Sequence, residues 1–314
     1  MLNFALKRIA QAIPILFLVS LISFGIMYLV PGDPAAYLAG QNATADDIAR
    51  VRESLGLDKS LPQQLVIFYS NLLRGDLGHS YILGQPVAEM VISRLPVSVS
   101  LTLYALVLTL IFGLIMGVVA ALNHNRWPDL TLMTLALIGV SIPNFWLGLA
   151  MIVLFAVKLG WLPTSGYVPF FEDPVAWLRY ATLPAMALAF MQIGLLARMT
   201  RSTMLEVLSQ DYVRTARAKG LAEPRVILRH ALSNALLPIV TLVGLIFSTL
   251  MSGSVVVETI FTTPGIGALL GNAIFQRDYP MIQGGLIFVA SLLLVLNIVV
   301  DLLYAVLDPR VRVK

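Results

Sequence analysis

Six apolar runs of about bilayer-crossing length constrain this chain more than any other feature. The first extends from Ile9 to Val30, and at about 1.5 Å of helical rise per residue it covers roughly 33 Å, enough to cross a hydrocarbon core. Apolar residues make up 58% of the 314 residues and charged residues only 12%, a balance typical of membrane proteins. The sequence therefore predicts an all-α integral membrane fold, with one transmembrane domain over 1–314. The expected spans are 9–30, 97–122, 130–157, 183–200, 238–257 and 281–306.

The basic residues predict how these spans are oriented. Of the 21 lysines and arginines, 13 fall in the two terminal segments, the turn after 122 and the region from the end of the fourth span to 237. Five of the others lie in the long loop 31–95, which the positive-inside rule counts little. This distribution predicts cytoplasmic N- and C-termini, a large outside loop over 31–95 and a multi-pass protein of a cytoplasmic membrane.

Two amphipathic helices are expected within the outside loop. Thr44 with Asp47 provides a capping signal before the first, and Gly56 provides its stop. Apolar residues recur at helical spacing in the second. We expect these helices to lie on the outer membrane surface or against other spans, either as a packed cap or as a landing surface for a soluble partner. The apolar positions of the second helix are Leu65, Phe68, Leu72 and Leu73.

Small residues and proline predict how two of the spans pack. Gly113, Gly117 and Ala121 follow one another at four-residue spacing, which predicts close approach of another helix. Pro143 interrupts the third span and predicts a kink, for packing or for gating. The segment 258–280 is too polar and glycine-rich to cross the bilayer, so we expect it to dip back or to cap the outside.

The long polar and basic stretch between the fourth and fifth spans, within 201–237, predicts a helix-turn-helix. Gly220 can adopt a positive φ and end one helix, and Pro224 suits the first turn of the next. A simple basic retention signal would not need this arrangement of turn residues. The stretch therefore predicts an element that receives a cytoplasmic partner.

The chain reads RTARAKG at 214–220 and HALSNALLP at 230–238, and in these motifs it resembles the permeases of the dipeptide, oligopeptide and nickel branch of bacterial ABC importers. Arg214, Thr215 and Ala216 stand where other importer permeases have Glu-Ala-Ala, Gly220 fits the signature, and the late proline is Pro238. The reading RTARAKG followed by a HAL…NALLP stretch is typical of this branch. Further landmarks occur in order along the chain: PGDP at 31–34, LGLD at 55–58, GDLG at 75–78, RLP at 94–96 and DPRVR at 308–312.

This resemblance implies a type I ABC-importer permease fold and several partners. They are a second homologous permease subunit, two ATP-binding subunits or domains that bind ATP and Mg, and an extracytoplasmic substrate-binding protein at a bacterial inner membrane. The cytoplasmic helix-turn-helix would dock on the ATPase, with its apolar positions Leu205, Leu208 and Val213 in the contact. The residues expected to couple the two proteins are Asp211, Arg214, Ala216, Arg217, Lys219, Gly220 and Leu221.

Catalytic and metal chemistry are not expected in this chain. There is no GxxxxGK[ST] motif to cradle nucleotide phosphates, so ATP hydrolysis is expected elsewhere. His79, His124 and His230 fall in different loops and cysteine is absent, so no metal cluster is predicted. We therefore expect no enzyme activity, no cofactor and no nucleic-acid partner; the basic residues instead collect beside the spans.

Two polar features inside the spans carry the remaining hypotheses. A small polar stripe on the fifth span either packs against another helix or lines the translocation path. Asn297 and Asp301, four residues apart on the sixth span, form a candidate buried polar pair, as an interhelical hydrogen bond or as the proton relay of an ion-coupled carrier or channel. A membrane scaffold without transport would not need the stripe. Its members are Thr241, Gly244, Ser248 and Ser252.

The substrate is the least constrained property. The resemblance implies import of di- or oligopeptides, with a nickel chelate or glutathione as the alternative within the same family. Few charges and small side chains suit a passage that holds peptides loosely, and the resemblance implies that selection is made by the separate binding protein.

Overall fold

The computed structural model describes residues 2–29, 33–39, 43–54 and 56–307. Helices dominate these residues, and no strand is assigned among them beyond one isolated bridge between His79 and Pro86. The elements are α1 (Leu2–Leu29), α2 (Pro34–Ala39), α3 (Ala45–Ser54), α4 (Leu61–Leu73), α5 (Val87–Leu122), α6 (Trp127–Ser141), α7 (Asn144–Met151), the π-helix η1 (Ile152–Lys158), α8 (Pro174–Leu208), α9 (Asp211–Ala218), α10 (Glu223–Arg225), the π-helix η2 (Val226–Leu232), α11 (Ser233–Ile260), α12 (Ile266–Phe275) and α13 (Tyr279–Leu307).

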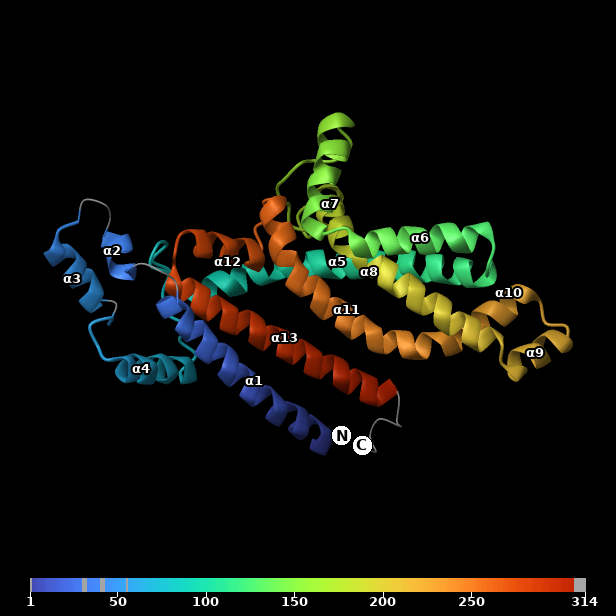
Figure 1. Ribbon diagram of the computed structural model, residues 1–314, viewed down its shortest axis with the longest axis horizontal. Helices are drawn as coiled ribbons and strands as arrows, with labels where there is room; N and C mark the ends of the chain where they lie inside the picture. The colour runs from blue at the N-terminus through green and yellow to red at the C-terminus, as the bar shows by residue number, and fades with distance from the viewer. Residues whose placement is uncertain (1, 30–32, 40–42, 55, 308–314) are drawn as a thin grey trace. The chain divides into compact units, whose positions relative to one another are not determined.

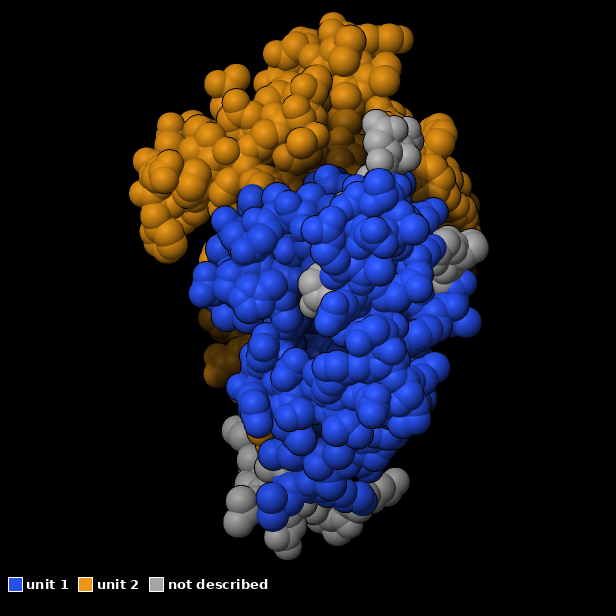
Figure 2. Space-filling model, turned by 90° about the vertical axis from the view of Figure 1, so that its left-hand side faces the viewer, with its two compact units in different colours: residues 1–95, 269–298 blue, residues 96–268, 299–314 orange. Residues whose placement is uncertain are grey.

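The helices form two compact units, coloured separately in Figure 2. The first unit comprises 1–95 and 269–298, and the second comprises 96–268 and 299–314. The prediction of one transmembrane domain over 1–314 stays a prediction beside this division.

Five helices of the described residues are long and apolar enough to cross a membrane: α1, α5, α8, α11 and α13. A sixth crossing is possible only if α6 and the α7–η1 helix form one span, and these two are bent by 105° (Figure 1). The bend falls at Pro143, which caps the start of α7 with extended backbone. The predicted kink in 130–157 is thus a full break of the helix, because Pro143 cannot donate to the helical ladder and Ile142 before it is extended.

The helices of all six predicted spans begin before the predicted residue, and two of them, α5 and α8, begin the earliest relative to the prediction. The helix expected over 183–200 begins at Pro174, where Asp173 Oδ1 accepts from the N–H groups of Val175 and Ala176 at 3.0 Å each. Capping of the first turn and a proline at its start explain the extension. The same helix then continues without a break to Leu208. The span expected over 97–122 likewise begins at Val87.

Close helix contacts of α8 make up the centre of the second unit. A Cβ atom added to Gly113 would lie 2.8 Å from Leu196, and one added to Gly117 would lie 2.4 Å from Thr200. The predicted approach of another helix to the small residues of α5 is therefore confirmed, and that helix is α8. On another side of α8, a Cβ at Gly194 would lie 2.4 Å from the carbonyl oxygen of Ala136 in α6.

Both helices expected in the loop 31–95 are present, as α3 and α4. Thr44 and Asp47 form the predicted cap of α3, with the Thr44 N–H donating to Asp47 at 3.0 Å and the Asp47 N–H donating to Thr44 Oγ1 at 3.3 Å. The Thr44 hydroxyl, which donates to Asp47 Oδ2 at 2.7 Å, and the Thr44 N–H hold the pKa of the Asp47 carboxyl below its usual range. Gly56 follows with a φ of 67° and ends the turn after α3. The short helix α2 was not expected.

Candidate coupling site

The helix-turn-helix expected between the fourth and fifth spans is present as α9, α10 and η2, and it joins α8 to α11 (Figure 1). Gly220 has a φ of 75°. Its N–H donates to the carbonyl of Arg217 at 2.9 Å, and the N–H of Leu221 donates to that of Ala216 at 3.4 Å, which closes the end of α9. Pro224 lies in the first turn of α10, as predicted.

A small apolar core holds this element together. Val213, Ala216 and Val226 are buried against one another, and Val207, Leu208 and Leu221 pack around them. Leu205 packs in a second cluster, with Ala121 and Met204. The structure corrects the expectation that Val213 and Ala216 contact a partner protein, because these side chains already fill the interior of the helix-turn-helix.

The outward surface of the element is polar and charged. Arg217 Nε lies 2.8 Å from Glu223 Oε1, and Arg214 lies 3.6 Å from Asp211. All four side chains are well exposed, so these pairs contribute little stability and stay accessible to a partner. Lys219 is also exposed, and Tyr212 places an aromatic ring 44% exposed on the same short helix. Tyr212 was not among the predicted coupling residues, although an aromatic residue next to apolar Val213 on an amphipathic helix was a signal in the sequence.

A buried ion pair, which was not predicted from the sequence either, ties the first turn of α6 to α8. Asp129 is 1% exposed. Arg201 donates to both of its carboxylate oxygens, from Nε to Oδ1 and from Nη2 to Oδ2, the latter at 2.7 Å. The N–H of Asn125 donates to the same oxygen at 2.9 Å, and His124 Nδ1 lies 3.0 Å from Arg201 Nη2. Asp129 and Arg201 each stand near the end of an apolar run, which was the available signal.

The polar stripe on α11 does not lie in one environment. Gly244 is buried, and a Cβ there would lie 2.0 Å from Val300 of α13, so at this position the stripe is a helix contact. Ser252 is exposed and donates to the carbonyl of Ser248 at 3.0 Å. The side chain of Thr241 lies outside the described part of the chain. A translocation path along this stripe stays a prediction.

The second polar hypothesis concerns α13. Asn297 is partly buried in this helix. Asp301 belongs to the same helix, but its side chain lies outside what the structure describes. Their pairing therefore stays a prediction.

The segment 258–280 contains a further buried carboxylate, that of Glu258 at the end of α11. One of its oxygens accepts from the N–H of Gly267 at 2.7 Å and from that of Ala268 at 3.3 Å. A Cβ at Gly267 would lie 2.2 Å from the backbone of Val255, so only glycine permits this approach. Glu258 therefore fastens the first turn of α12 to α11.

Replacing Glu258 by alanine is expected to loosen this turn by about 2 kcal/mol, because two backbone N–H groups lose their acceptor. The amides of Gly267 and Ala268 should then exchange with deuterium roughly thirtyfold faster, as measured by hydrogen exchange in nanodiscs. Glu258→Gln keeps an acceptor oxygen and should show a smaller increase. Unchanged exchange in the alanine variant would contradict the role of Glu258.

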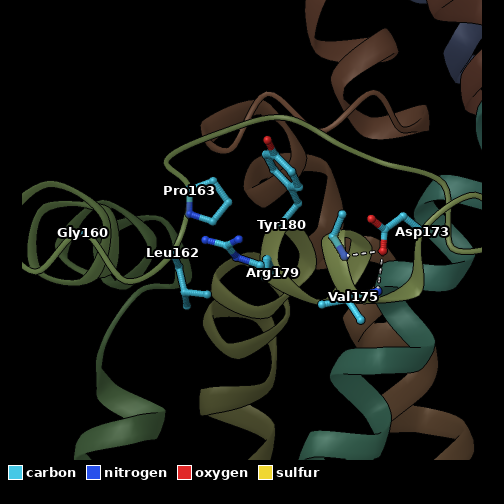
Figure 3. Close-up of a pocket in the computed structure, with 8 residues that line it drawn as sticks. Gly160, Leu162, Pro163, Asp173, Val175, Arg179 and Tyr180 are labelled. Carbon is cyan, nitrogen blue, oxygen red and sulfur yellow. Dashed lines mark hydrogen bonds between the residues drawn. The ribbon is translucent and has the colours of Figure 1, made fainter.

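A cleft of about 470 Å³ lies at the start of α8 (Figure 3). The preceding segment contributes Gly160, Leu162 and Pro163, and the first turns of α8 contribute Arg179 and Tyr180 among others. Arg179 extends toward Pro163 in this view, while the Tyr180 ring points upward beside them. The cleft combines an apolar wall with an exposed guanidinium. No group of three or more potential metal ligands occurs among the residues that were described.

A solved transporter has the same fold. The crystal structure of an amino acid ABC transporter with histidines superposes with a TM-score of 0.52 over 71% of this chain and 94% of the other, at 16% identity. The all-α fold is thus that of an ABC-importer permease. Residues 110–313 match the family described as binding-protein-dependent transport system inner membrane component, and 1–102 match its N-terminal family. The chain belongs to this family and is a multi-pass inner-membrane component of a transport system.

Two relatives are similar to the chain along nearly their whole lengths. A candidate peptide transport system permease protein of Brucella abortus (strain 2308) is 51% identical over 307 residues, 98% of each chain. The glutathione transport system permease protein GsiC of Escherichia coli (strain K12) is 44% identical over 314 residues, the full length of both.

Proposed function

We propose that this chain is a permease subunit of an ATP-driven importer that passes peptides across the inner membrane. The observation that carries the proposal is the helix-turn-helix around Gly220. It has its own small apolar core, and the charged side chains of α9 are exposed on its surface. The two relatives described above supply the substrate class, one named for peptides and one for glutathione. Glutathione is itself a tripeptide, so it is the second candidate substrate.

The coupling role rests on how the segment is connected. α8 runs as one helix from Pro174 to Leu208 and leads directly into α9, while η2 leads into α11. A partner that binds the exposed side chains of α9 and then moves would therefore displace both α8 and α11. We assign this contact to an ATP-binding subunit and expect Asp211, Arg214, Arg217 and Lys219 to form its polar rim. Gly220 and Leu221 would shape the turn that the subunit receives, supported from beneath by Ala216.

We extend the proposal to the rest of the assembly, which membership of this family supports. ATP and Mg belong to the ATP-binding subunits, and a substrate-binding protein delivers the peptide on the opposite side of the membrane. We infer a second, homologous permease subunit that completes the passage, and cytoplasmic N- and C-termini in keeping with the distribution of lysine and arginine. The stripe of Thr241, Gly244, Ser248 and Ser252 is our proposal for part of the path.

The proposal is tested by purifying the tagged chain from its native membrane in a mild detergent and identifying the co-purifying proteins by mass spectrometry. We expect an ATP-binding protein and a second permease in comparable amounts. Recovery of the chain alone, or only with itself, would overturn the importer assignment and leave an ion-coupled carrier built on Asp301 as the hypothesis to test. Calorimetric titration of the associated binding protein with dipeptides, longer peptides and glutathione then ranks the substrates.

A further inference from the structure

Helix α4 differs from its neighbour α3 in a way that points to lipid. The 13 residues Leu61–Leu73 contain no acidic or basic side chain, and Lys59 and Arg74 stand just beyond the two ends. α3, by contrast, alternates Asp, Glu and Arg with a few apolar residues. Of these two helices, α4 is the one with the composition of a helix that leaves water.

The contacts of α4 place it along a membrane span. Its residues meet α1 in antiparallel order: Tyr28 donates to Gln64, Phe24 packs on Phe68 with ring centroids 5.3 Å apart, and the Tyr69 hydroxyl lies 3.1 Å from Ser20 Oγ. Further along, Phe17 stacks on Tyr69. The interval from Tyr28 back to Phe17 corresponds to roughly 16 Å of helix. This covers about half of a hydrocarbon core about 30 Å thick.

The face of α4 that points away from α1 is apolar, and its side chains are exposed among the described residues. Val66 is 68% exposed and Leu73 is 87% exposed. Between Lys59 and Ile67, this face also holds a shallow groove that Pro62 and Val66 line. α1 also has exposed apolar side chains, among them Leu18 and Ile22, so both helices present apolar surface.

Each glutamine of α4 makes at least one local side-chain hydrogen bond, which lowers the cost of its burial in lipid. Gln63 Oε1 accepts from the N–H of Ser60 at 3.2 Å. Gln64 Nε2 donates to the carbonyl of Lys59 at 2.8 Å, and its oxygen accepts from Tyr28. These bonds lower the free energy needed to take the two glutamines out of water.

We propose that α4 is embedded in the bilayer leaflet that contains the C-terminal half of α1, with its outward face and groove in contact with lipid acyl chains. Lys59 then lies just before the N-terminal end of α4, where its ammonium reaches the membrane–water interface while its aliphatic stem stays among apolar atoms. α4 is thus a membrane-embedded helix that does not span, anchoring the loop 31–95. This inference is independent of the transported substrate.

Site-directed spin labelling tests the proposal directly, since the chain has no cysteine to remove. Val66→Cys, Ile22→Cys and Arg50→Cys are labelled in the full chain, reconstituted in vesicles of phosphatidylethanolamine and phosphatidylglycerol. Collision rates are measured with oxygen, which concentrates in lipid, and with a nickel chelate, which stays in water. Arg50 on α3 is the aqueous control, and Ile22 on α1 is the lipid reference. All three native side chains are exposed, so the labels disturb no packing.

The expected result is an oxygen-to-nickel collision ratio at Val66 that matches Ile22 and is several-fold above Arg50. A second label at Leu73 should give the same result. A ratio at Val66 equal to that at Arg50 would mean that the helix lies in water and would overturn the proposal. Protection of Val66 from both reagents would overturn it too, because it would mean that protein, such as a second subunit, covers this face.

Discussion

Replacing Gly220 by valine is expected to reduce peptide uptake to background while the protein remains inserted in the membrane. Gly220 has a φ of 75°, where a side chain costs about 1–2 kcal/mol and a β-branched residue costs more. No atom lies within 4 Å of a Cβ added at this position, so the effect comes from the backbone and not from a clash. Valine should open the turn that closes α9 and so misplace the exposed charged side chains. Uptake in vesicles and the amount of co-purified ATP-binding protein measure the result.

Gly56→Val is the matched control for this experiment. Gly56 has a φ of 67°, also with nothing within 4 Å of an added Cβ, but it follows α3 in the loop 31–95. It should impose a similar local strain and leave the ATP-binding protein attached. Normal uptake in the Gly220 variant, or equal loss of the ATP-binding protein in both variants, would refute the coupling role of this turn.

The turn at Gly220 could be predicted from the sequence because its causes are local. A glycine, a proline four residues later and the polar residues around them are sufficient to define where one helix ends and another begins. The cap of α3 by Thr44 and Asp47 was predictable for the same reason. The orientation of Val213 and Ala216 was harder, because an apolar residue on an amphipathic helix can face its own chain or a partner protein. Only the buried contact with Val226 decides between these two possibilities.

Long-range partners and helix breaks were beyond local reasoning. Asp129 and Arg201 belong to different helices, and nothing in the residues around either one specifies the other. Pro143 predicted a bend but not its size of 105°, which depends on where the extended backbone at Ile142 directs the chain. The early start of α8 was, by contrast, encoded by Asp173 and Pro174, a capping signal that the apolar pattern overshadowed. Local signals thus defined helix ends, while tertiary contacts defined the remainder of the site.

Replacing Arg201 by alanine is expected to destabilise the second unit by about 3 kcal/mol, because Asp129 would remain buried without its countercharge. The Asp129 side chain is 2% exposed, while that of Arg201 is 24% exposed and partly reached by solvent. We therefore place the loss at the low end of the range for buried pairs. Thermal unfolding of the purified chain in detergent measures it. Arg198→Ala, which removes an exposed arginine from the same helix, is the control and should have little effect.

The double variant Asp129→Asn with Arg201→Ala distinguishes the stability that the ion pair contributes from the cost of leaving a buried carboxylate unpaired. An uncharged asparagine can still accept from the N–H of Asn125, which lies 2.9 Å from the native carboxylate. The double variant should therefore recover much of the stability that Arg201→Ala alone loses. The single variant Asp129→Asn completes the comparison. If its loss of stability and that of Arg201→Ala simply add in the double variant, the carboxylate and the guanidinium act independently. α6 would then be held to α8 by the close helix packing at Gly194, and not by this ion pair.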